Sequence, residues 1–413
     1  MAVKHRHNIL SKYYSSISIN EEYYNKFVFN IMVLLTMALL PVYAFSSGGF
    51  QLVDIPIFIN ACLLVFYIKG SNTKLLIAIY FYIPFVIWSI LVNLGYSLIS
   101  PDRYYFFIIA QFLQGIVIFY IYTILFDNLI YNNNLKYIYI GILLSIIMCF
   151  LIKGNYEEGV RNSLSFNNPN QLGYYALIVM SFTILLYEYC NRKKNFNLLY
   201  IILNVLFILS AHILIILSLS RSAIFGIFIL DIWLIKNIKR REIFYSIIII
   251  SILSTALLLI KPDLIDNQLK GRETRKYQDG AVTYALQERF SGQFKGMTTP
   301  QFIFGTGGLG GYETGGKQFV IKSKNSIATG EFHNTFGAIL KYYGIIGISL
   351  FLLWIIKMLM YSITFKDSLF IYIALSFYNM THYGIRFRPF WVLLSLILAV
   401  TCNISKLESQ NKS

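Results

Sequence analysis

One polar pair stands where a long water-compatible segment of the chain meets a long apolar run. The pair is His333–Asn334, and the apolar run after it carries Gly344 and Gly347. A neutral imidazole can take a proton from a hydroxyl group while that hydroxyl attacks another centre. We therefore predict that His333 is a catalytic base at a membrane surface, where a membrane-spanning helix begins. The adjacent Asn334 is predicted to bind the substrate.

Three arginines lie in segments that we place on the same side of the membrane as His333. Arg161 begins RNSLSFNNPNQLG, Arg221 lies in the short turn SLSRSAIFG, and Arg289 lies in ERFSGQF. A guanidinium group forks onto phosphate oxygens and stays charged at neutral pH. Such arginines can hold a pyrophosphate and stabilise its charge as it leaves, while His333 activates an acceptor hydroxyl. The alternative for each arginine is a solvated or headgroup-facing charge.

A second pair of charged residues lies within apolar runs. Read as one continuous helix, the stretch from His333 places Lys341 and Gly344 on the same face as His333. Lys341 then lies about 12 Å deeper than His333, at a rise of about 1.5 Å per residue. A lysine at that depth is costly unless it is paired or reached by water, and we predict Asp231 as its partner.

The composition places the chain in a membrane. Its residues are 57% hydrophobic and only 13% charged, whereas about a quarter of the residues of a soluble domain are charged. Apolar runs of about 20 residues recur along the chain, as in polytopic helical membrane proteins. The net charge of +16 does not indicate nucleic-acid binding, because the Lys and Arg residues lie in short loops between apolar runs.

The apolar runs predict an all-α polytopic protein with about twelve transmembrane helices and a large extracytoplasmic loop. The candidate spans are 27–45, 55–68, 75–98, 104–126, 137–152, 171–189, 198–217, 222–235, 243–260, 334–356, 369–384 and 389–403. The expected regions are a cytoplasmic N-terminus at 1–26, nine helices within 27–260, the large loop at 261–332, three helices within 333–403 and a cytoplasmic tail at 404–413.

Basic residues indicate the orientation of this bundle. They are concentrated in the short loops on the side of the N-terminus, so both termini are expected in the cytoplasm and His333 on the outer face. The four cysteines form no CxxC, and none lies within 261–332, so we expect neither a disulfide framework nor a metal site. The glycine-rich stretch Phe304–Gly316 is expected to be a flexible or tightly turned loop, with a mobile lid over a site as the alternative.

Four motifs together resemble one known family. His333–Asn334, nine residues, Gly344, two residues and Gly347 resemble the signature of the bacterial O-antigen ligase and O-antigen polymerase superfamily. RNSLSFNNPNQLG resembles the Arg-then-NPN-x-x-G segment of that family, and SRSAIFG resembles its arginine at an outward turn. ERF before FGTGGLG resembles its later arginine and glycine-rich loop. The chain departs at Leu164, where the family usually has glycine.

The resemblance implies a metal-independent, cofactor-free glycosyltransferase of the GT-C type in the bacterial inner membrane. Its donor would be a glycan on undecaprenyl pyrophosphate, used on the periplasmic or outer face. We expect an inverting polymerase of O-antigen, capsular or exopolysaccharide repeat units, with a second lipid-linked unit as acceptor, membrane lipid around it and a chain-length regulator as partner. The alternatives are a ligase that transfers the glycan to lipid A-core and a flippase for lipid-linked oligosaccharide. A transporter usually shows internal repeats, and we find none.

Overall fold

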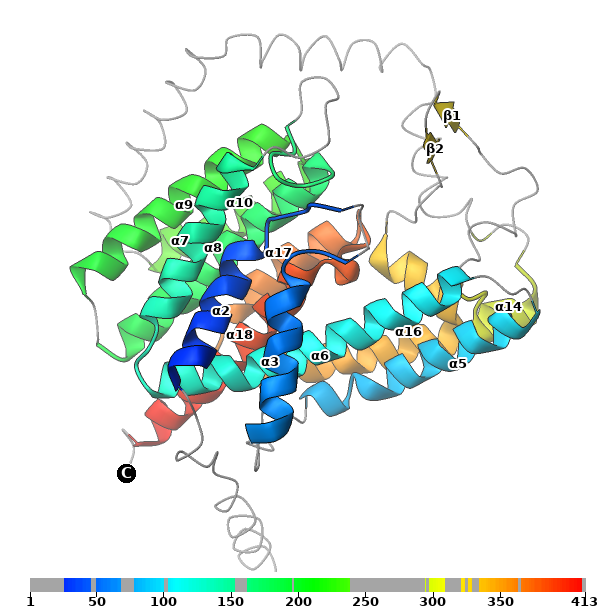
Figure 1. Ribbon diagram of the computed structural model, residues 1–413, viewed down its shortest axis with the longest axis horizontal. Coiled ribbons are helices and arrows are strands. Elements are labelled where there is room, and N and C mark those ends of the chain that lie inside the picture. Colours follow the sequence, from blue (N-terminus) through cyan, green and yellow to red (C-terminus); the bar gives the residue numbers. More distant parts are fainter. Residues whose placement is uncertain are drawn as a thin grey trace, which may run out of the picture.

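The structure is a computed structural model. It describes residues 26–45, 50–67, 78–99, 103–152, 162–194, 197–237, 294, 297–308, 321–323, 326–328, 334–362 and 365–410. These residues form a bundle of helices with one short hairpin (Figure 1). Six helices among them are long and apolar enough to cross a membrane: Ala78–Ile99, Tyr105–Tyr131, Pro169–Arg192, Leu198–Ser218, Thr335–Ser362 and Arg388–Ser409. The prediction of a helical membrane protein is confirmed at this level.

Apart from α14, which lies within the predicted loop 261–332, the helices overlap the predicted apolar runs. They are α2 Lys26–Leu39, α3 Asp54–Tyr67, α5 Ile83–Ile99, α6 Arg103–Tyr131, α7 Lys136–Leu151, α8 Pro169–Arg192, α9 Leu198–Ser218, α10 Arg221–Asn237, α14 Thr299–Phe304, α16 Thr335–Ser362, α17 Ser368–Asn379 and α18 Arg388–Gln410. A 3-10 turn, η3, covers Gly384–Arg386, and strand β1 (Ile321–Ser323) pairs antiparallel with β2 (Ser326–Ala328). The predicted span 243–260 lies outside the described residues, and a total of twelve spans stays a prediction.

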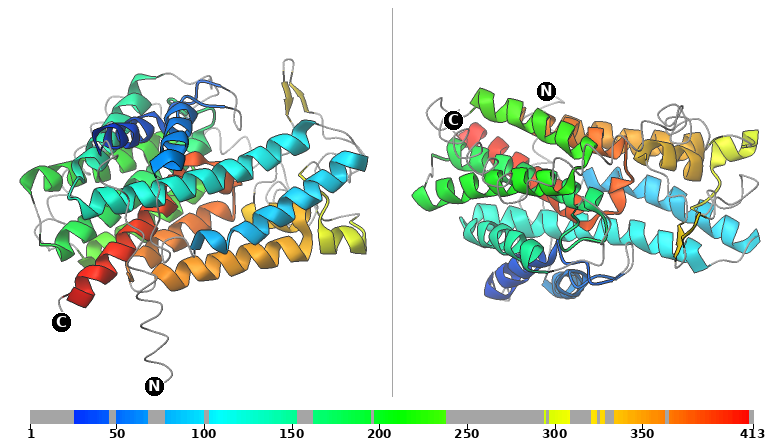
Figure 2. Two further views of the ribbon diagram at one scale, coloured as in Figure 1. Left: turned by 60° about the horizontal axis from the view of Figure 1, so that its bottom comes forward. Right: turned by 90° about the horizontal axis from the view of Figure 1, so that it is seen from above.

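Two helices form the centre of the bundle. Within an apolar 18-residue stretch of each helix, 89% of the residues are buried in α8 and 78% in α18. The corresponding share in α16 is 33%. A helix that is buried on every side must be apolar or small on every side, and α8 meets this with Gly173, Ala176 and Ser181 among its buried residues. α18 packs along α6 and against α8, while α9 and α10 cover α8 from other sides (Figure 2).

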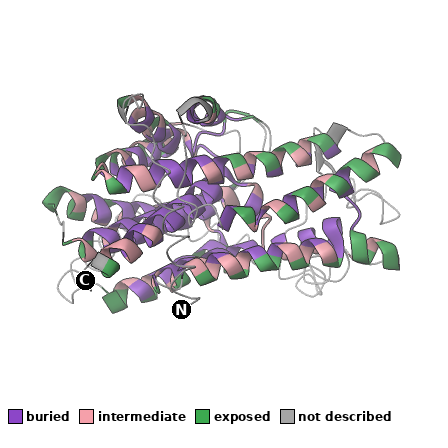
Figure 3. Cartoon of the chain, turned by 90° about the horizontal axis from the view of Figure 1, so that it is seen from below, coloured by how far each residue is buried: buried purple, intermediate pink, exposed green. Residues whose placement is uncertain are grey.

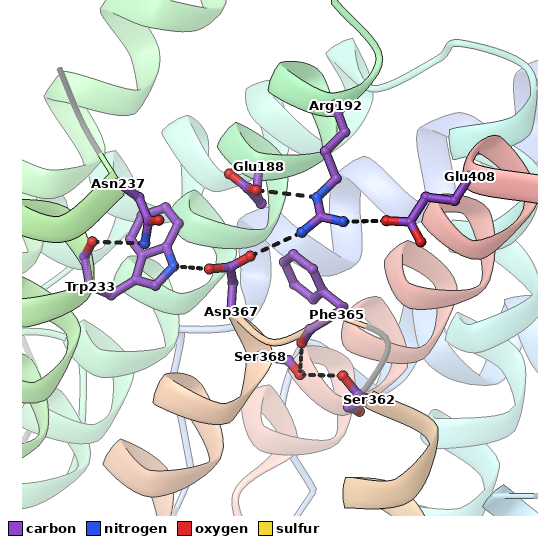
Figure 4. Close-up of polar contacts among 9 residues, drawn as sticks. All are labelled: Glu188, Arg192, Trp233, Asn237, Ser362, Phe365, Asp367, Ser368 and Glu408. Carbon is purple, nitrogen blue, oxygen red and sulfur yellow. Dashed lines mark hydrogen bonds and ion pairs between the residues drawn. The ribbon is translucent and has the colours of Figure 1, made fainter. Parts of the chain in front are cut away.

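One arginine ties four helices together where α8 and α18 end. Arg192 donates to Glu188 (3.2 Å), to Asp367 at the beginning of α17 (3.3 Å) and to Glu408 on α18 (2.6 Å). Asp367 also accepts a hydrogen bond of 2.6 Å from the Trp233 indole of α10 (Figure 4). The guanidinium fork suits this arrangement because it donates in several directions at once. The network fixes the ends of these helices relative to one another.

Candidate functional site

The sequence motifs meet at the opposite end of the bundle. We call this region the convergent end and define it as residues 162–173, 217–222, 334–335 and 379–388. Helices α8, α10, α16 and α18 all begin here. The beginning of a helix carries unpaired N–H groups and the positive end of the helix dipole, so a gathering of such ends favours anions.

The segment that follows Arg161 contacts the turn that holds Arg221. The Asn162 amide donates to the Leu217 carbonyl over 3.0 Å. Gly173 lies so close to α10 that an added Cβ would be 2.8 Å from the Ser220 Cβ. Gly173 is the glycine of the NPN-x-x-G motif, so this motif lets the Arg221 turn approach α8 closely.

The Arg221 turn is built from short backbone and side-chain contacts. Leu219 adopts a left-handed conformation (φ 52°) that ends α9, and the Ser220 amide donates to the Ser218 hydroxyl over 3.2 Å. Ser220 and Ser222 are buried on either side of Arg221, whose side chain is exposed. Within the described part of the chain, no hydrogen bond or ion pair reaches the Arg221 guanidinium.

Asn334 begins α16 and caps it. Its Oδ1 accepts the Phe336 amide at 3.0 Å and the Gly337 amide at 3.2 Å, as the side chain of an N-cap residue does. We predicted that Asn334 binds substrate. The side-chain oxygen caps the helix because the first amides of a helix have no partner within it, and a role of Asn334 toward a substrate stays a prediction.

Asn379 joins the beginning of α16 to the beginning of α8. Its Oδ1 accepts from the Thr335 hydroxyl at 3.0 Å, and its Nδ2 donates to the Tyr174 hydroxyl at 3.2 Å. The Thr335 hydroxyl also lies 2.8 Å from the His382 carbonyl and accepts the Gly384 amide at 3.1 Å. Asn379 and His382 were not among the predicted site residues, although the stretch NMTHYG is a polar break between two apolar runs.

Arg388 is neutralised by a buried carboxylate. Its Nε lies 2.5 Å from Asp54 Oδ1 and its Nη2 lies 2.7 Å from Oδ2, and Gln114 adds a donor at 2.6 Å. The side chains of Asp54 and Arg388 are only 8% and 6% exposed. This two-point pairing holds the beginnings of α3 and α18 together, so Arg388 is a structural residue.

Replacing Asp54 with asparagine is expected to lower the free energy of unfolding by about 3–5 kcal/mol, because it removes the carboxylate charge that faces the buried Arg388 guanidinium. Asp127→Asn is the control. Its partner Lys406 is 3.5 Å away with a side chain 43% exposed, so about 1 kcal/mol or less is expected. Thermal unfolding in detergent measures both. Equal, small losses would show that Arg388 does not depend on Asp54.

The helix α16 is broken at Gly344, which adopts φ 66° and ψ −169°. The break divides α16 into 335–343 and 345–362, so the predicted continuous face that carries Lys341 and Gly344 is wrong. The last carbonyls of the first part would lose their helical partners in a membrane, where no water replaces them. Lys341 O instead accepts from Thr306 N at 3.1 Å, Tyr342 O from Gly307 N at 3.0 Å and Tyr343 O from Trp88 Nε1 at 2.8 Å.

We call this contact between 305–308 and 341–344 the glycine clamp. A Cβ at Gly344 would lie 2.2 Å from the Ile303 carbonyl oxygen, and a Cβ at Gly305 would lie 2.2 Å from that of Tyr342. Both glycines are therefore required by the close approach of two backbones. The described part of the glycine-rich stretch, up to residue 308, is a fixed turn, and 309–316 lie outside the described residues.

The predicted pair of Lys341 and Asp231 is not formed. The Asp231 carboxylate lies 3.3 Å from His212 Nε2, which joins α10 to α9. Both α16 and α10 pack on α17, but no ion pair joins Lys341 to Asp231 among the described residues. Lys341 is 5% exposed and stands in the last turn before the break, where a cation is favoured by the helix dipole. His212 was overlooked, although it lies in the apolar run next to that of Asp231.

Three predicted site residues lie outside the described residues: His333, Arg161 and Arg289. Their roles stay predictions. The residues that follow two of them in the chain, Asn334 and Asn162, both lie at the convergent end. Within the described part of the chain, no group of three or more His, Cys, Asp or Glu side chains is placed to hold a metal ion.

Comparison with known proteins adds no relative. Neither a scan against protein-family models nor a search of curated proteins finds a match for this chain. The likeness to the O-antigen ligase and polymerase superfamily therefore rests on the motif residues, and any function rests on the geometry described above.

Proposed function

We propose that the protein is a membrane glycosyltransferase that polymerises lipid-linked repeat units of a surface polysaccharide. One observation carries the proposal. Two motifs far apart in the chain, at 162–173 and around Arg221, contact each other, and Asn379 joins the segment at 334–335 to Tyr174, the residue that follows the first motif. The three motifs of a single catalytic site would have to meet in this way.

Each group has a role that its chemistry suits. Arg221, together with Arg161 and Arg289, binds the pyrophosphate of an undecaprenyl-pyrophosphate glycan, and the helix beginnings add to the positive potential. His333 takes the proton of the acceptor hydroxyl. The hydroxyl oxygen bonds to the anomeric carbon from the side opposite the pyrophosphate, and the carbon–oxygen bond to the pyrophosphate breaks with inversion. Undecaprenyl pyrophosphate leaves with the bonding electrons, stabilised by the arginines.

The orientation belongs to the same proposal. We place the protein in the bacterial inner membrane with both termini in the cytoplasm and the convergent end on the outer face, because basic residues are concentrated on the other side. The glycan acceptor is a second lipid-linked unit, and a chain-length regulator is the expected protein partner. No metal or cofactor is required if arginines neutralise the leaving group.

A deletion strain tests the class of function. Loss of a polymerase leaves single repeat units on the surface core, seen as one short band when the glycan is run on a gel. Loss of a ligase, the second candidate, leaves a bare core and long chains on the lipid carrier. An accumulation of single units on the inner face of the membrane would indicate a flippase and would overturn the proposal.

Arg221→Lys is expected to lower the rate of transfer about tenfold or more, because a point charge does not replace a fork on pyrophosphate. Lys194→Arg is the control, since Lys194 is exposed and lies near the Arg192 network at the other end of the bundle. Transfer is measured in membranes from the length distribution of the glycan. Full activity of the lysine variant would mean that Arg221 meets only lipid headgroups.

A further inference from the structure

The short helix α14 and the end of α5 expose a group of large apolar side chains. They belong to two separate parts of the chain and lie at one end of the bundle (Figure 1). The exposed fractions are 86% for Leu98, 81% for Ile99, 40% for Phe302, 38% for Ile303 and 51% for Phe304. α14 falls within 261–332, the segment that the sequence analysis assigned to a water-facing loop.

α14 is held firmly against the helices that cross the membrane. It packs on α16, and the ring of Phe304 lies 6.2 Å from that of Trp88 on α5. Just after it, Tyr96 donates to the Gly305 carbonyl at 3.0 Å, and Asn93 accepts the Gly308 amide at 2.8 Å. The position of these side chains is therefore set by the spans themselves.

The exposed surface of α5 and α16 is also made of large apolar side chains. On α5 it extends through Ile87 (52% exposed) and Leu91 (57%), and on α16 through Ile345 (44%) and Leu352 (42%). Figure 3 shows exposed residues along these helices out to the end of the bundle. Apolar residues of a membrane-crossing helix face lipid, so the same surroundings are indicated for the residues that extend this surface.

We propose that α14 lies in the bilayer, with Phe302, Ile303 and Phe304 among the acyl chains. The partner is membrane lipid. Large apolar side chains that are exposed side by side are unfavourable in water, whereas a short helix with one apolar face is stabilised when it enters the boundary between headgroups and acyl chains. α14 then anchors an interior part of the long segment 261–332 to the membrane, and the glycine clamp joins it to α16 at residues 341–344.

The test adds one cysteine at a time to the full chain, which is reconstituted into vesicles. Phe302→Cys is compared with Leu353→Cys, which is 42% exposed on α16 and represents lipid, and with exposed Asn162→Cys, which represents water. Leu98→Cys is a second variant in case Phe302→Cys fails to fold. The unmutated chain, whose Cys62 is exposed, supplies the background. Each variant is treated with a membrane-impermeant maleimide and, separately, with a bimane label in brominated phosphatidylcholine.

The maleimide is expected to modify Phe302→Cys at least about tenfold more slowly than Asn162→Cys, because the thiol lies below the headgroups. Brominated lipid should quench the bimane at residue 302 as strongly as at residue 353. Modification as fast as that of Asn162→Cys would place α14 in water and overturn the proposal. Neither modification nor quenching would mean that protein covers α14, which also overturns it. None of these outcomes depends on the proposed enzymatic activity.

Discussion

Replacing His333 with alanine is expected to abolish glycan transfer while the protein still inserts into the membrane at normal abundance. The imidazole is the proposed base for the acceptor hydroxyl, and loss of such a group typically lowers a rate by about 10²–10⁴-fold. The surface glycan of cells that carry the variant should then resemble that of the deletion strain. Gel analysis of the glycan, together with quantification of the protein in the membrane, measures the effect.

A second histidine, His382, serves as the control that tests whether His333 in particular is the base. The carbonyl of His382 lies 2.8 Å from the hydroxyl of Thr335, so this histidine contacts the beginning of α16. The His382 ring lies 4.7 Å from the ring of Tyr378. His382→Ala should retain transfer if His333 is the base. Loss of transfer in His382→Ala together with normal glycan in His333→Ala would show that the wrong histidine was assigned.

Replacing Gly344 with alanine is expected to lower the free energy of unfolding by about 2–4 kcal/mol, through backbone strain and overpacking. The conformation at φ 66° and ψ −169° is one that side-chain-bearing residues rarely adopt. The added methyl would also meet the Ile303 carbonyl oxygen at 2.2 Å and the Gly305 nitrogen at 2.7 Å. Thermal unfolding in detergent, with the fraction of monodisperse protein as a second readout, measures the loss.

Gly95→Ala is the matched control for this substitution. Gly95 lies within α5, and no atom stands within 4 Å of an added Cβ there. Alanine in a helix is favoured over glycine by about 0.5–1 kcal/mol, so this variant should be as stable as the unmutated protein or slightly more so. Equal stability of the two variants would mean that α16 passes through residue 344 as an unbroken helix.

The amino-acid sequence determined the class of protein and most of its helices. Whether a segment enters a membrane as a helix depends on its own length and apolarity, since its backbone hydrogen bonds close within the segment. The turn between α9 and α10 could also be predicted from the sequence, because the serines and Arg221 lie between two apolar runs. The sequence also predicted that the segments around Arg161, Arg221 and Asn334 serve one site. The described parts of these segments lie at one end of the bundle, and the shared site stays a prediction.

The tertiary structure alone decided which residues meet. Asp54 pairs with Arg388, Asp231 with His212, and Asn379 with both Thr335 and Tyr174. Each of these pairs depends on which helices pack together and at what height, and apolarity carries no information about either. The break at Gly344 depends in the same way on the approach of residues 303–307. A glycine in a helical pattern is compatible with a close helix contact or with a break, and only the neighbouring backbone selects between them.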